Sequence, residues 1–179
     1  MDTIKVMYIS GYRSFELGIF KDNDPKMTVI KKVLKNELTQ LVEEGLEWVI
    51  ISGNLGVELW AGEVVAEMKT DYPELKLGII YPFTEFGNGW NENNQEKKRL
   101  VEQLSDYRES VSHQPYQSPS QLRNHTQFIL QHTDGTLLIY DPEYPGKTDY
   151  FFKDAQKYQG SHPYEIRTVS MDDLQNFSE

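Results

Sequence analysis

The sequence predicts an α/β protein with a Rossmann-like, mostly parallel sheet sandwiched between helices. Short apolar runs alternate along the chain with segments of helical periodicity, which is the pattern of strand–helix–strand units. The run at 47–52 has a continuous apolar middle, typical of a strand covered on both faces. A length of 179 residues fits one domain with its own core. We therefore expect a single Rossmann-like domain over residues 1–179.

The first half of the chain gives three strands and two helices. A strand is predicted over residues 4–9, where an apolar run ends in the turn 10–13. A helix over 26–44 follows, because its apolar residues recur every three or four positions. The second strand, 47–52, leads through the turn 53–56 into another helix, which the pair Tyr72-Pro73 ends. The third strand is expected at residues 75–81.

The second half continues the alternation. A helix over 95–105 precedes a weak strand signal at 107–112. Ser118 is predicted to cap a helix that has Pro119 in its first turn and runs to about residue 132. The later elements are expected to be a strand at 136–140, a helix at 148–158, a strand at 164–169 and a short helix at 172–176.

Composition excludes several classes of protein. The chain has no cysteine, so a disulfide scaffold, a thiolate nucleophile and a zinc–cysteine site are excluded. The net charge of -10 argues against binding to DNA or to an anionic membrane. No apolar run approaches the roughly 18 residues of a membrane span, and the start lacks the features of a signal peptide. We expect a cytoplasmic protein.

Metal and serine-hydrolase sites have no support in the sequence. The four histidines lack paired ligand spacing, so no metal is expected, and no G-x-S-x-G elbow is present. Ligands of parallel α/β sheets bind beyond the carboxyl ends of the strands. The turns after the strands are therefore where function is sought.

The turn after the second strand is the most informative segment. Gly53 and Gly56 flank Asn54 there, and glycine lets the backbone come close to a ligand while helix-start amides hold a phosphate. The alternative is a tight turn that needs glycine for steric reasons alone. Glu58 is placed either as a carboxylate favoured by the helix dipole or beside a bound sugar, where it would bind hydroxyls or attack an anomeric carbon.

Two further turns are candidates. Gly11 and Arg13 end the first strand and are expected to face the 53–56 turn, with Arg13 as a phosphate partner or simply a solvated side chain. Gly146, Lys147 and Thr148 resemble the end of a P-loop, but Asp141 stands where its first glycine is needed, so an ATPase is rejected. That helix start still suits a phosphate.

Other side chains at the same edge complete the candidate set. Tyr140 and Asp141 belong to the mouth that Gly146–Thr148 form, and Arg123 with Asn124 lies on the helix before it. Phe83, Phe86 and Trp90 follow the third strand and either stack on a base or hold the loop to the body.

Three segments resemble the YpsA-like proteins of Gram-positive bacteria, a family of the SLOG superfamily that also holds DprA and the LOG phosphoribohydrolases. They are residues 51–61 (ISGNLGVELWA), 11–20 (GYRSFELGIF) and 137–143 (LLIYDPE). The resemblance covers nearly the whole chain. It implies a Rossmann-like fold and a pocket for a nucleotide such as NAD or ADP-ribose, but it does not assign a definite cofactor. It also implies a link to cell division or envelope control.

The resemblance also assigns residues. Gly11, Arg13, the 53–56 turn and Glu58 match the glycine-rich pocket of the superfamily, and Arg123-Asn124 is similar to a pair in DprA-like members. The phosphoribohydrolases carry P-G-G-x-G-T followed by paired glutamates, whereas this chain has PGKTDY at 145–150. Only one glycine of that motif remains, Gly146, and the glutamate pair is absent, which weakens the hydrolase interpretation.

Three hypotheses follow. The first is a nucleotide-binding or nucleotide-sensing regulatory protein. The second is an enzyme that cleaves an N-glycosidic bond with Glu58 as its catalytic residue. The third is a protein-interaction module with a vestigial pocket. A protein partner and oligomer formation both stay open at this point.

Overall fold

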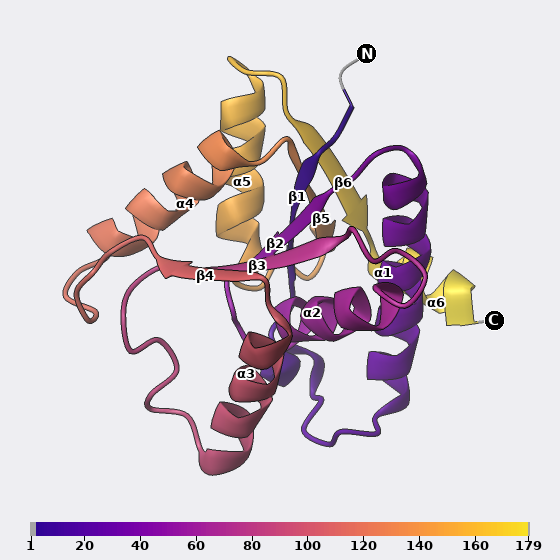
Figure 1. Ribbon diagram of the computed structural model, residues 1–179, viewed down its shortest axis with the longest axis horizontal. Coiled ribbons are helices and arrows are strands. Elements are labelled where there is room, and N and C mark those ends of the chain that lie inside the picture. The colour runs from indigo at the N-terminus through magenta and orange to yellow at the C-terminus, as the bar shows by residue number, and fades with distance from the viewer. Residues whose placement is uncertain (1–2, 179) are drawn as a thin grey trace.

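The computed structural model describes residues 3–178 and contains one six-stranded parallel sheet (Figure 1). The strands are β1 (Val6–Gly11), β2 (Trp48–Ile51), β3 (Lys76–Tyr81), β4 (Tyr107–Ser110), β5 (Gly135–Ile139) and β6 (Glu165–Val169). The helices are η1 (Ser14–Leu17, a 3-10 turn), α1 (Pro25–Glu43), α2 (Val57–Met68), α3 (Glu92–Leu104), α4 (Ser120–His132), α5 (Thr148–Gln159) and α6 (Met171–Ser178). The predicted fold class, an α/β Rossmann-like sheet, is confirmed.

The strand order β4-β3-β2-β1-β5-β6 places a topological switch point beside β1. The chain runs outward from β1 to β4, crosses back over the sheet and continues from β5 to β6. β1 pairs in parallel with both β2 and β5, in a register that sets Ile9 against Leu137. In open α/β sheets the crevice at such a point is the usual place for a ligand.

Two helix layers cover the sheet. α1, α2 and α3 lie on one face and α4 and α5 on the other, while α6 packs beside α1 (Figure 1). The larger core lies under α1 and α2, and smaller clusters lie under α4 and α5. β5 is buried along its whole length, as is typical of a strand inside a parallel sheet that helices cover on both faces. No helix within residues 3–178 has the length and hydropathy needed to cross a bilayer.

Local capping explains where helices depart from prediction. α3 begins at Glu92, earlier than expected, because the Asn91 side chain accepts a hydrogen bond from Asn94 N at 2.8 Å. The predicted Ser118 cap is wrong: α4 begins at Ser120, and the Gln121 side chain accepts from Ser118 N at 3.1 Å. The predicted weak strand at 107–112 ends earlier, at Ser110. η1 was not predicted from the sequence.

The turn between β2 and α2 needs its glycines for packing. Gly53 and Gly56 have φ angles of +87° and +100°. A Cβ on Gly56 would lie 2.5 Å from the Tyr12 carbonyl oxygen and 2.6 Å from the Ser14 amide nitrogen. A Cβ on Gly53 would meet the Tyr81 ring. The steric explanation of these glycines is therefore sufficient, and it brings the loops after β1 and β2 into direct contact.

We predict that Gly56→Ala lowers the free energy of unfolding by about 3 kcal/mol or more, because positive-φ strain and a backbone clash add. Gly18→Ala is the matched control. Gly18 also has positive φ, +66°, but a Cβ there meets no atom within 4 Å, so only about 1–2 kcal/mol is expected. Urea denaturation measures both variants. Equal losses would contradict the close contact at Gly56.

Candidate functional site

A cavity of about 480 Å³ lies at the carboxyl ends of β1, β2 and β3 and at the start of α5. We call it the strand-end cavity. Its polar lining is Tyr8, Ser10, Arg13, Ser52, Asn54, His125, Thr126, Lys147 and Thr148. Its apolar and aromatic lining is Pro82, Phe83, Phe86, Tyr116, Leu122, Tyr150 and Phe151. It occupies the switch point that the strand order creates.

The Glu58 carboxylate lies beneath this cavity and is 1% exposed. Its Oε1 accepts hydrogen bonds from Ser52 N at 2.7 Å and from Asn54 N at 3.4 Å. Its Oε2 accepts from Ser10 Oγ at 3.0 Å and from Asn54 Nδ2 at 2.8 Å. The nearest cation is Arg13, whose Nη1 is 3.8 Å from Oε2. One buried charge therefore holds the ends of β1 and β2 together.

This geometry favours a positioning role for Glu58. A buried carboxylate is stable only when its lone pairs are satisfied, and here both oxygens accept from neighbouring segments. All four residues that donate to Glu58 or pair with its charge line the strand-end cavity, but Glu58 does not; they are Ser10, Ser52, Asn54 and Arg13. Attack on an anomeric carbon would require these hydrogen bonds to break.

A chain of hydrogen bonds crosses the floor of the cavity. Tyr8 Oη lies 2.7 Å from Ser52 Oγ, which lies 3.1 Å from His125 Nε2. His125 Nε2 also lies 2.8 Å from the Ile80 carbonyl oxygen. A carbonyl only accepts, so Nε2 carries the proton and Nδ1 is the unprotonated nitrogen. Burial lowers the pKa of His125 and raises that of Tyr8, so both side chains are neutral at pH 7.

The start of α5 supplies an unpaired hydroxyl and a cation. Thr148 is 2% exposed, and its Oγ1 is the only buried side-chain polar atom within residues 3–178 that has no hydrogen-bond partner. Lys147 precedes it and is exposed. The Glu16 carboxylate of η1 accepts from Lys147 N at 2.9 Å and from Arg13 N at 2.7 Å. Glu16 thus holds the main chains of the two cationic residues that line the cavity close to one another.

Aromatic side chains form the opposite wall. Phe83 makes edge contacts with Phe86 and Tyr116 at ring-centroid distances of 5.5 Å and 5.3 Å. Trp90 packs on Phe86 at 5.6 Å but does not line the cavity. Phe83 and Phe86 therefore lie where the sequence placed a stacking surface, and Trp90 supports them from behind.

The structure separates the predicted site residues into three groups. The residues that line the cavity are Arg13, Asn54, Lys147 and Thr148. The second group lies behind the cavity wall or in the loop at 140–147 between β5 and α5, which we call the supporting loop. This group is Gly11, Gly53, Gly56, Glu58, Tyr140, Asp141 and Gly146. Arg123 and Asn124 are exposed and do not line the cavity, unlike their helix neighbours Leu122 and His125.

The supporting loop is held by its own polar contacts. Asp141 accepts hydrogen bonds from Glu143 N at 2.9 Å and from Met171 N at 3.1 Å, which ties the loop to α6. The Tyr140 hydroxyl donates to Asp149 on α5. Neither side chain reaches the cavity, and both set the position of the helix that begins at Thr148.

Sequence reasoning missed Tyr8, Ser10, Ser52 and His125. Ser10 and Ser52 each stand at the end of an apolar run, directly before a glycine. That position alone was a signal for two hydroxyls at the switch point. His125 and Tyr8 had no such signal, because only the packed structure brings them to Ser52.

We predict that Glu58→Gln lowers the free energy of unfolding by about 2–3 kcal/mol, because the new amide group faces hydrogen-bond donors. Glu63→Gln on the same helix is the control. The Glu63 side chain is 40% exposed and pairs with Lys31, so less than about 1 kcal/mol is expected. Chemical denaturation measures both. A small, equal loss in the two variants would rule out the anchoring role of Glu58.

The neutral His125 predicts a pH dependence of stability. Its pKa is below the ordinary value of 6.5 in the fold. Below pH 6.5 the unfolded chain therefore binds a proton that the folded chain does not, and the free energy of unfolding falls. The slope contributed is at most about 1.4 kcal/mol per pH unit. Denaturation of the parent and of His125→Gln between pH 5 and 8 tests this, and parallel curves would refute it.

Comparison with known proteins places the chain. Residues 7–174 match the family model YpsA, described as the YspA SLOG family. A UPF0398 protein of Enterococcus faecalis is 63% identical over 176 residues, covering 98% of each chain. UPF0398 proteins of Limosilactobacillus reuteri and Bacillus licheniformis are 48% and 45% identical, covering 98% and 96% of this chain and 94% and 93% of theirs. The chain belongs to the YpsA family of SLOG proteins.

Proposed function

We propose that the protein binds a nucleotide-type small molecule, such as ADP-ribose or NAD, in the strand-end cavity and acts as a sensor or regulator. The observation that carries this proposal is the chemistry of the lining. Arg13 and Lys147 line the cavity, and no carboxylate among residues 3–178 does, although the whole chain has 28 acidic and 18 basic residues. A cationic cavity in an acidic protein favours an anionic ligand.

The unpaired Thr148 hydroxyl supports a phosphate at the start of α5. A buried hydroxyl without a partner is destabilising, and a phosphate oxygen would supply the missing acceptor. The same place offers Lys147, Arg13 and the positive end of the α5 dipole. Phe83, Phe86 and Tyr116 offer an aromatic surface for a base.

Three polar residues suit the sugar that joins the phosphate to the base. Ser10, Ser52 and Asn54 lie between the aromatic wall after β3 and the cations beside β1 and β5. Their hydroxyl and amide groups match the hydrogen-bonding needs of a ribose. Glu58 would act through these residues by fixing their positions, and the supporting glycines Gly11, Gly53 and Gly56 would let the walls approach one another.

The other two hypotheses draw less support. The N-glycosidic enzyme needs a free carboxylate, whereas Glu58 accepts four hydrogen bonds and is buried. A vestigial pocket would not need to keep an unpaired buried hydroxyl. The contacts of the cavity say nothing about cell division or envelope control, and these roles stay expectations from the resemblance.

We predict opposite effects of Thr148→Val on stability and on binding. Removal of an unpaired buried hydroxyl should leave the melting temperature of the free protein unchanged or higher. Loss of a hydrogen bond to a charged phosphate should weaken ligand binding by about 1.5–3 kcal/mol. Thermal shift with NAD, ADP-ribose, AMP, ATP and cyclic dinucleotides identifies the ligand, and calorimetry compares the variants.

Thr126→Val is the matched control. Thr126 also lines the cavity, but its hydroxyl already donates to the Leu122 carbonyl at 3.2 Å, so its loss should change affinity little. A panel in which no nucleotide binds at millimolar concentration would contradict the proposed function. If the parent and Thr148→Val bind the ligand with equal affinity, the proposed position of the phosphate at the start of α5 is wrong.

A further inference from the structure

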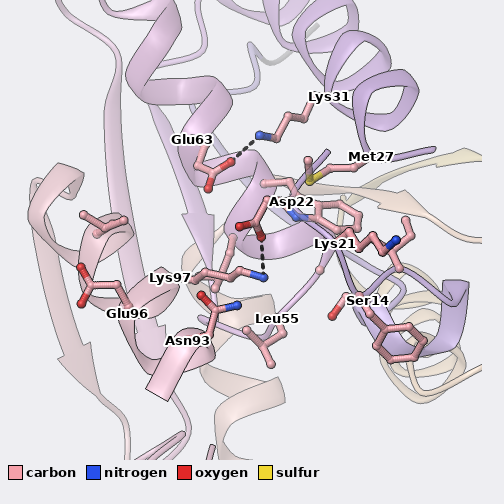
Figure 2. Close-up of a pocket in the computed structure, with 16 residues that line it drawn as sticks. Ser14, Lys21, Asp22, Met27, Lys31, Leu55, Glu63, Asn93, Glu96 and Lys97 are labelled. Carbon is pink, nitrogen blue, oxygen red and sulfur yellow. Dashed lines mark ion pairs between the residues drawn. The ribbon is translucent and has the colours of Figure 1, made fainter. Parts of the chain in front are cut away.

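A second cavity, of about 290 Å³, lies on the helix face that α1, α2 and α3 cover (Figure 2). We call it the helix-face cavity. The loop between η1 and α1 forms its fourth wall. It lies behind the strand-end cavity, since Ser14 and Leu55 line it while their neighbours Arg13 and Asn54 line the other. The function proposed above does not use it.

The floor of the helix-face cavity is apolar and its rim carries exposed apolar side chains. Ile19, Leu59 and Trp60 are buried in the floor. Phe20 on the loop is 75% exposed, and Leu100 on α3 is 50% exposed. Phe20 and Leu100 thus continue the apolar floor out to the surface, and a contiguous exposed apolar patch is typical of an interaction site.

The charged side chains that line this cavity are balanced in number, and four of them form two ion pairs. Lys31 lies 2.5 Å from Glu63, and Lys97 lies 2.9 Å from Asp22, as the dashed lines in Figure 2 show. Three lysines and three carboxylates line the cavity, against 18 basic and 28 acidic residues in the whole chain. No unpaired buried polar group within residues 3–178 lies here, since the one such atom belongs to Thr148. The surface therefore suits an apolar side chain better than a polar metabolite.

A second copy of the chain meets these conditions. A two-fold interface sets the same patch against itself, so the patch must carry both the projection and the hollow. Here Phe20 is the projection, and the apolar floor beside it is the hollow. Balanced charge lets the lysines of one copy face the carboxylates of the other, whereas the acid excess elsewhere repels itself.

We propose that the protein forms a two-fold dimer through the helix-face cavity, with Phe20 of each copy inserted into the cavity of the other. One aromatic side chain and Leu100 per copy make a small apolar centre. An interface with so small an apolar centre is expected at the weak end of specific association. We therefore expect a reversible dimer with a dissociation constant in the micromolar range rather than an obligate one.

Sedimentation equilibrium of the full chain, from micromolar to millimolar concentration, tests this proposal. The parent should shift from monomer to dimer as concentration rises. Phe20→Glu should raise the dissociation constant at least tenfold, and Phe20→Leu should restore most of the association. Phe177→Glu is the control, because Phe177 is 44% exposed on α6 and lies outside the cavity.

Two results would overturn the proposal. One is a parent that stays monomeric throughout the range, which would leave a different protein as the occupant. The other is a Phe20→Glu variant that dimerises as tightly as the parent, which would place the interface elsewhere. Circular dichroism checks that each variant is folded. If Phe20→Glu does not fold, Leu100→Glu makes the same test from α3.

Discussion

The buried carboxylate of Glu58 is the constraint on which the strand-end cavity depends. It is an almost fully buried charge, and such a charge is stable only with a full set of donors. Ser10 at the end of β1, Ser52 after β2 and Asn54 in the following turn provide them. Satisfying Glu58 therefore fixes three separate segments. The polar floor of the cavity is a consequence of that single requirement.

The glycine turn after β2 lies between the two cavities. Gly56 packs against the backbone of Tyr12 and Ser14, and this contact forms a wall between residues that line the strand-end cavity and residues that line the helix-face cavity. Polar groups and cations gather on one side of this wall, and apolar side chains with paired charges gather on the other. A change on either side would act on the same turn, which carries Asn54 and leads into the helix that holds Glu58.

Sequence alone predicted the layers of the fold and the edge of the sheet that carries the cavity. Apolar runs and helical spacing suffice for that, and chain order predicts that parallel strands end at one edge. The direction in which a helical side chain points was harder to predict from the sequence. Arg123 and His125 are two positions apart, about 200° around the helix, and only the docking of α4 decides that His125 faces the cavity and Arg123 faces solvent. The unpaired state of Thr148 depends on every neighbour at once and has no sequence signal.

A crystal structure of the protein with the nucleotide that gives the largest thermal shift would test the central claim most directly. The account predicts a phosphate oxygen within hydrogen-bond distance of Thr148 Oγ1, beside Lys147 and Arg13, with the base against Phe83. The Glu58 hydrogen bonds would stay intact beneath the ligand. A nucleotide bound elsewhere, or one that leaves Thr148 Oγ1 without a partner, would contradict the account.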